Sequence, residues 1–173
     1  MNSQSDRMLL VFSWDFDDLP IHEQWYRMAC AYLDSSLRLV SEMIDRRTQD
    51  TFHHALVVVH LFEHSIELFL KAAISAAESS VPTHHRAAEL LGRYRNLYPA
   101  KRFAFHGRID EAAASDPDSP TNEWARYPVD KDQARWKRNR HIDLEVWGRE
   151  LAILREDFDR IWLEVRTQHD NAS

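Results

Sequence analysis

The sequence predicts an all-α protein, folded as an up-and-down bundle of four to five helices with an extended strap at its N-terminus. Glycine and proline are scarce, at 3 and 6 of 173 residues, which disfavours a turn-rich β fold. Hydrophobic residues make up 44% of the chain and recur every three to four positions over long segments, as in amphipathic helices. This length suits one well-buried core, so we expect residues 1–173 to form a single domain.

The first half of the chain contains the predicted strap and two long helices. In the strap, residues 1–19, the run FSWDFD alternates aromatic and polar side chains with the period of two that is typical of extended chain. Pro20 is a favourable first residue for a helix, which we expect to reach about Arg47. A second helix, from about Thr51 to Ala77, is apolar nearly all round and is therefore expected at the centre of the bundle.

The second half is less regular before its final helix. Thr83 has the side chain of an N-cap and is expected to start a third helix, which Pro99 stops. The run KRFAFHGRIDEAAA at 101–114 is expected to hold a short helix. Residues 116–141 contain several prolines and polar residues, so we expect an irregular loop there.

The last predicted helix runs from about Asp143 to Thr167. Its apolar residues alternate at intervals of three and four without interruption: Leu144, Trp147, Leu151, Leu154, Phe158, Ile161 and Val165. This pattern is typical of a stripe buried against neighbouring helices.

Charge, cysteine content and hydropathy disfavour nucleic-acid-coating, membrane and secreted proteins. A formal charge of −6 argues against coating nucleic acid or anionic membrane through the net field, although a local basic patch could still bind phosphate. The single cysteine, Cys30, lies among apolar helix positions and is interpreted as a buried thiol. No stretch approaches the roughly 18 apolar residues of a membrane helix, and MLLVF near the N-terminus is too short for a secretion signal. We therefore expect a cytoplasmic protein without a membrane partner.

The segment HLFEH, residues 60–64, matches the reversed zinc-protease pattern H-x-x-E-H. A helical projection at about 100° per residue places Glu63 in the middle of the inward face and Glu67 at its margin. His64 and Lys71 project further out. Because the histidines do not point inward together, we predict no metal and no cofactor; a metal-binding helical bundle stays as the least favoured alternative.

Glu63 is the most informative residue of this segment. A carboxylate on a buried face needs a cationic or hydrogen-bonding partner, since burying an unpaired charge costs several kcal/mol. Two interpretations stay open: a polar anchor that fixes the register of two helices, or a carboxylate of a functional site.

The sequence RWKRNRH forms the densest positive cluster of this acidic chain. Its members are Arg135, Trp136, Lys137, Arg138, Arg140 and His141. Such a cluster could bind phosphate groups while Trp136 stacks on a base. The alternative is a solvated loop whose cations pair with neighbouring acidic residues.

The order of several short motifs resembles the HEPN family of small helical bundles. The motifs are LFEHSIELFLKAAI, THHRAAELLGRYRNLYP and WARYPVD, followed by a long final helix; the resemblance covers roughly residues 20–165. It implies a bundle of four or five helices and a homodimer that acts in toxin–antitoxin pairs, phage defence or RNA processing. An antitoxin or a nucleotidyltransferase-like protein would be its partner.

Active members of that family are metal-independent ribonucleases with an R-x(4–6)-H motif before a late helix. Here Arg135 and His141 match this position, with five residues between them. The resemblance then implies that His141 acts as general base or acid and Arg135 stabilises the phosphorane, with Glu63 orienting either one. Trp136 stands where active members usually have a small polar residue, so the alternative is a non-catalytic module that binds a nucleotide or a partner protein.

Overall fold

The computed structural model is an all-α bundle, which confirms the predicted fold class. The structure describes residues 18–46, 52–78, 80, 82–107, 109 and 143–170. These residues contain four α-helices and one short 3-10 helix, in the order α1, α2, α3, η2 and α6, and no strand. Residues 1–17 of the predicted strap and the predicted loop at 116–141 lie outside the described residues.

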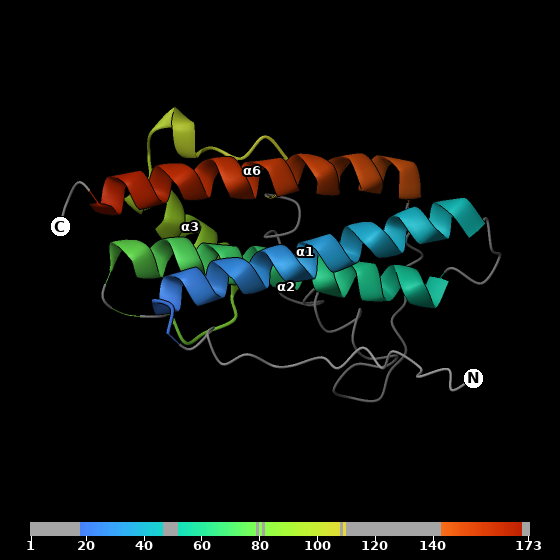
Figure 1. Cartoon of the computed structure of the whole chain (residues 1–173), viewed down its shortest axis with the longest axis horizontal. Coiled ribbons are helices and arrows are strands. Elements are labelled where there is room, and N and C mark those ends of the chain that lie inside the picture. The colour runs from blue at the N-terminus through green and yellow to red at the C-terminus, as the bar shows by residue number, and fades with distance from the viewer. Residues whose placement is uncertain are drawn as a thin grey trace, which may run out of the picture.

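Three long helices lie side by side (Figure 1). They are α1 (Ile21–Arg46), α2 (Phe52–Ala77) and α6 (Leu144–Asp170). The chain reverses direction between α1 and α2, and α6 runs in the same direction as α2, so α1 is antiparallel to both (Figure 1). Each of these helices therefore has one end near the start of α1 and the other near its end.

α2 is the central helix, as its composition predicts. It packs against α1, α3 (Ala87–Leu97) and α6. Every residue from Ser65 to Ile74 is buried. Over these ten positions α2 has no solvent face at all, and polar residues in this stretch are enclosed together with apolar ones.

α6 begins with a side-chain cap and buries the stripe that its sequence predicts. Oδ1 of Asp143 accepts hydrogen bonds from the backbone N–H groups of Glu145 and Val146, both at 3.0 Å. Five residues of the stripe are at most 2% exposed: Leu151, Leu154, Phe158, Ile161 and Val165. The ring of Phe158 stacks on that of Phe69 in α2, with 4.1 Å between the centroids.

α3 begins three residues later than the sequence predicts. Residues 82–86 are not helical, Thr83 is exposed, and Arg86 occupies the N-cap position with extended backbone and no side-chain cap bond. In this segment Nδ1 of His85 lies 2.7 Å from Oε1 of Glu67 on α2. A helix started at Thr83 would have to give up that contact, so a long-range hydrogen bond prevails over the local capping preference. α3 ends at Leu97, ahead of Pro99, as predicted.

The segment after α3 is fastened to α6 by one buried carboxylate. It starts with the 3-10 helix η2 (Lys101–Phe103), which stands in place of the start of the predicted short helix. Asp157, 1% exposed, accepts hydrogen bonds from the backbone N–H groups of His106 at 2.6 Å and Gly107 at 3.0 Å. Arg160 donates to Asp157 at 2.7 Å, so the carboxylate is both paired and hydrogen-bonded.

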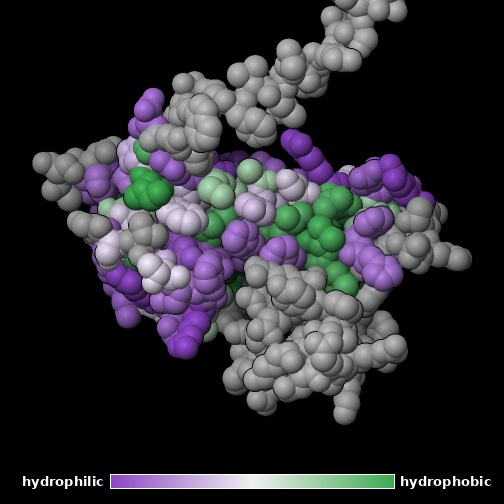
Figure 2. All heavy atoms as spheres, turned by 90° about the horizontal axis from the view of Figure 1, so that it is seen from below, coloured by the Kyte–Doolittle hydropathy of each residue, from purple (hydrophilic) through white to green (hydrophobic). Residues whose placement is uncertain are grey.

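Some hydrophobic side chains reach the surface, as the green areas of Figure 2 show on the face seen from below. Among the described residues the large exposed ones are Ile21, Met28, Val57, Ile153 and Leu163. Cys30, by contrast, is buried as predicted, and burial raises the pKa of its thiol. None of the described helices combines the length and hydropathy that crossing a bilayer requires.

Candidate functional site

The HLFEH segment lies in the first half of α2, level with the start of α6. The ring of Phe62 meets the ring of Trp147 edge to face, with 5.2 Å between the centroids. Trp147 is the fourth residue of α6. Glu63, the next residue after Phe62, is partly buried. The predicted site carboxylate therefore lies on α2 at the level where α6 begins.

The burial of charged residues on α2 differs from the prediction. Glu63, expected in the middle of the inward face, is only partly buried. Glu67, expected at the margin, and Lys71, expected further out, are 6% and 3% exposed. The projection assumed that one side of the helix faces solvent, whereas neighbouring parts of the protein enclose α2 on all sides from Ser65 to Ile74.

Glu67 is the buried centre of a polar group, which we call the Glu67 cluster: Glu67, Lys71, His85 and His64. Nζ of Lys71 lies 2.8 Å from Oε1 of Glu67, and Nδ1 of His85 lies 2.7 Å from the same oxygen. Nδ1 of His64 is 3.9 Å from Oε2, which is too far for a hydrogen bond. Two elements distant in sequence, α2 and the segment before α3, thus meet at one carboxylate.

The electrostatics of the cluster keep Glu67 ionised. Burial by itself raises the pKa of this carboxyl, but the contacts with His64, Lys71 and His85 outweigh burial and lower the pKa to about 2. The two short contacts, from Lys71 and His85, must carry most of this effect, because interactions with a buried carboxylate weaken with distance.

Aromatic rings surround the cluster. The Lys71 ammonium lies over the ring of Trp25, 5.6 Å from the centroid, a cation–π arrangement. The ring of Tyr32 meets that of His64 edge to face at 4.6 Å, and the rings of His64 and His60 stack at 6.0 Å. The ring of Trp25, on α1, therefore covers the Lys71 ammonium, and Tyr32 covers the neighbouring His64.

The cluster reaches solvent through His85. Its side chain is 71% exposed, while Nδ1 faces the carboxylate. A carboxylate at Nδ1 fixes the tautomer of a neutral imidazole with the proton on that nitrogen, so the other nitrogen becomes an acceptor. The Glu67 carboxylate can orient the His85 ring, and the ring can then exchange a proton with a bound molecule. Lys71 keeps the carboxylate charged. Within the described residues no group of three or more His, Cys, Asp or Glu side chains has the arrangement of a metal site.

The predicted basic segment lies outside the part of the chain that the structure describes. It comprises Arg135, Trp136, Lys137, Arg138, Arg140 and His141. Of the predicted site residues only Glu63 is described, and the grouping of Glu63 with Arg135 and His141 stays a prediction.

Sequence reasoning assigned no role to the charged pair that the structure buries. One signal was present: Glu67 and Lys71 are four residues apart, the spacing at which a glutamate and a following lysine pair on a helix. No comparable signal pointed to His85, which lies 18 residues from Glu67 and joins it only in the folded bundle.

Comparison of the chain with protein-family models finds no match, and comparisons with curated proteins and with solved structures find none either.

Proposed function

We propose that this protein is an HEPN-like bundle that acts on RNA in the cytoplasm, as a metal-independent ribonuclease toxin or phage-defence effector. The residues that would carry the reaction are Arg135 and His141, with Glu63 as a positioning residue. A homodimer would complete the site, since HEPN proteins, which this chain resembles, form their cleft between two copies. A nucleotidyltransferase-like protein or an antitoxin would be the regulating partner.

One observation supports this proposal above the others: the position of Glu63 relative to the start of α6. Asp143 caps α6, so the Arg135–His141 segment ends two residues before the cap. The contact of Phe62 with Trp147 brings α2 against the first turns of α6, one residue away from Glu63. Each residue of an extended chain spans at most about 3.6 Å, so the proposal requires the two residues before the cap to turn back toward this part of α2.

The chemistry needs no metal. Removal of the proton from a ribose 2′-OH lets that oxygen attack the adjacent phosphorus, and the 5′-oxygen of the next nucleotide leaves with a proton. His141 would accept or return these protons, and Arg135 would stabilise the added negative charge on the phosphorane. Glu63 would hold one of the two in place by a charge-assisted hydrogen bond.

A second function is favoured by a feature of the sequence. Trp136 follows Arg135 directly, where a small polar residue is usual in active members of the resembling family. A large ring at this position suits stacking on a base. In this alternative the protein is a non-catalytic module that binds a nucleotide, an oligonucleotide or a partner protein.

The test is incubation of purified protein with RNA in the presence of a metal chelator. The proposal expects cleavage by wild type and its loss in Arg135→Ala and His141→Ala, both of which should keep the helical circular-dichroism spectrum. Glu63→Gln should reduce the cleavage rate and leave RNA binding unchanged.

The chain offers a matched control, because Arg47 and His53 have the same spacing at a different place. Arg47→Ala and His53→Ala should cleave RNA as wild type does. A wild type that binds an oligonucleotide without cutting it would favour the non-catalytic module. If wild type neither cuts nor binds RNA, the ribonuclease is wrong, and of the non-catalytic alternative only binding of a nucleotide or a partner protein is left.

A further inference from the structure

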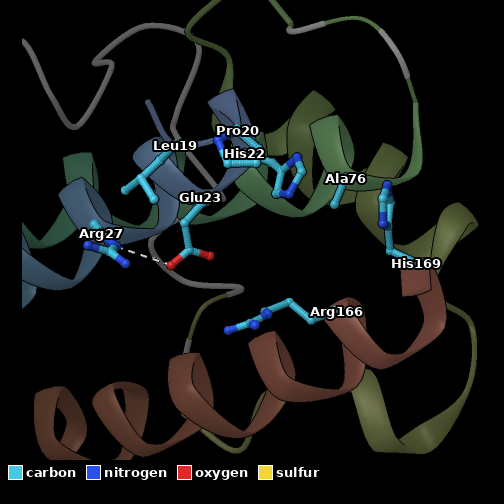
Figure 3. Close-up of a pocket in the computed structure, with 8 residues that line it drawn as sticks. All are labelled: Leu19, Pro20, His22, Glu23, Arg27, Ala76, Arg166 and His169. Atoms are coloured by element: carbon cyan, nitrogen blue, oxygen red, sulfur yellow. Dashed lines mark hydrogen bonds and ion pairs between the residues drawn. The ribbon is translucent and has the colours of Figure 1, made fainter. Parts of the chain in front are cut away.

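A pocket of about 380 Å³ opens at the end of the bundle where α1 begins and α6 ends. Figure 3 shows its lining, which comprises Leu19, Pro20, His22, Glu23, Arg27, Ala76, Arg166 and His169. Arg166 lies 22 positions after the first residue of α6, so about 33 Å of helix separates the pocket from the start of α6, the level at which Phe62 meets Trp147. The pocket is thus a separate place on the molecule.

The pocket carries a surplus of positive charge. Among the residues that the structure describes, it is lined by two guanidinium groups, two imidazoles and one carboxylate. That carboxylate is already engaged: Oε1 of Glu23 accepts from Nε of Arg27 at 3.1 Å, and Oε2 accepts from Nε1 of Trp162 at 3.1 Å. Arg166 makes no ion pair or hydrogen bond with any other residue that the structure describes, and it extends from α6 toward Glu23 (Figure 3).

The two histidines lie close together at one side of this pocket, next to Ala76 (Figure 3). The ring centroids of His22 and His169 are 5.5 Å apart. Burial lowers the pKa of His22, the positive fields of His169 and Arg166 lower it further, and the charge of Glu23 opposes them. An anion bound between these side chains would relieve that repulsion.

The helix ends do not explain the positive charge. The N-terminus of α1 brings a partial positive charge to this end of the bundle, and the C-termini of α2 and α6 each bring a partial negative one. Because these contributions oppose each other, the side chains must attract the anion. Leu19, Pro20 and Ala76 add apolar surface, and the volume falls in the range of small-molecule sites, so an anion with a small organic part fits.

We propose that this pocket binds the phosphate group of a small molecule, with Arg166 and His22 as its ligands and the apolar wall against the organic part. Arg166 supplies a planar pair of donors to two phosphate oxygens, and an imidazole supplies one further donor. The proposal does not depend on the ribonuclease activity, because it involves other residues, among them Arg166 near the C-terminal end of α6.

The test is a titration followed by NMR of the histidine ring protons, at constant ionic strength. The probes are inorganic phosphate, adenosine monophosphate, adenosine and acetate. Phosphate at millimolar concentration should shift the signals of His22 and His169, and the monophosphate should do so at a lower concentration because its organic part meets Leu19 and Pro20. Adenosine should leave both signals unchanged, and acetate should act more weakly than phosphate.

Two variants complete the experiment. Arg166→Gln should weaken phosphate binding about tenfold or more, the effect expected for loss of one charge-assisted contact. Arg149→Gln removes the same charge from an exposed position elsewhere on α6 and should bind like wild type. The proposal is wrong if phosphate causes no shift, if Arg166→Gln responds like wild type, or if acetate acts as strongly as phosphate. A monophosphate that binds more weakly than inorganic phosphate would overturn the assignment of the organic part.

Discussion

Replacement of Glu67 by Gln tests whether the Glu67 cluster is an ion pair that the fold depends on. Glu67 and Lys71 are 6% and 3% exposed, and Nζ of Lys71 lies 2.8 Å from Oε1 of Glu67. The variant keeps the size of the side chain and removes its charge, which leaves the ammonium buried beside the Trp25 ring. Breaking a buried pair from one side destabilises proteins by about 3–5 kcal/mol.

The pKa of Glu67 gives a second estimate of this magnitude. The pKa lies at about 2 in the folded protein, against an ordinary value of 4.5. The difference between these values corresponds to about 3 kcal/mol of folding free energy. Because the folded pKa is the lower one, this stabilisation is complete above pH 4.5 and is lost as the pH falls toward 2. Both estimates agree on a loss of about 3 kcal/mol, a large fraction of the roughly 5–15 kcal/mol that stabilises a domain.

Urea unfolding followed by circular dichroism measures the effect. Glu67→Gln should unfold at a clearly lower urea concentration than wild type at neutral pH, and the difference should shrink as the pH falls from 4.5 toward 2. The control is Glu42→Gln, which breaks the exposed pair of Glu42 with Arg46 and should change stability by no more than about 0.5 kcal/mol. A loss below about 1 kcal/mol in Glu67→Gln, with no change in pH dependence, would refute the reasoning.

The double variant Glu67→Gln/Lys71→Met tests whether the loss of stability in Glu67→Gln comes from the unpaired Lys71 ammonium. Once the lysine is replaced by an apolar side chain of similar length, neither position 67 nor position 71 carries a buried charge, and much of the stability should return. If the double variant is as unstable as the sum of the two single ones, Glu67 and Lys71 do not act as a pair.

Three further predictions concern packing, the segment after α3 and assembly. Leu154→Ala, at a position 2% exposed, should lower the free energy of unfolding by about 2–5 kcal/mol, whereas Leu163→Ala, 67% exposed, should change it by at most about 0.5 kcal/mol; equal urea midpoints would contradict the buried stripe. Asp157→Asn should speed hydrogen exchange at the backbone N–H groups of His106 and Gly107, and unchanged rates would show that the carboxylate does not hold this segment. We expect a homodimer, because hydrophobic side chains reach the surface (Figure 2) and the resembling family forms dimers. Light scattering should then give about twice the chain mass of 20.4 kDa, and a 20.4 kDa species at micromolar concentration would count against it.

The sequence by itself determined the helices. A helix that buries one face has apolar residues every three to four positions, and this spacing can be seen within the helix's own sequence. The stripe of α6 is the clearest case: the positions that alternate in the sequence, such as Leu151 and Phe158, are the ones that are buried. The ends of α1 and α2 also lie within a residue or so of the prediction. The Arg135–His141 segment was found from its charge and spacing alone, and its function stays a proposal.

Only the tertiary structure decided which charged residues of α2 are buried. Glu67 and Lys71 lie off the face that the apolar residues of α2 define, and they are buried because neighbouring elements close over that side as well. The contact of His85 with Glu67 likewise joins residues far apart in the chain and delays the start of α3. Such contacts depend on how the elements pack, so neither periodicity nor capping preference can reveal them. The pocket around Arg166 has the same origin, because its cations come from opposite ends of the sequence and meet only when α6 lies antiparallel to α1.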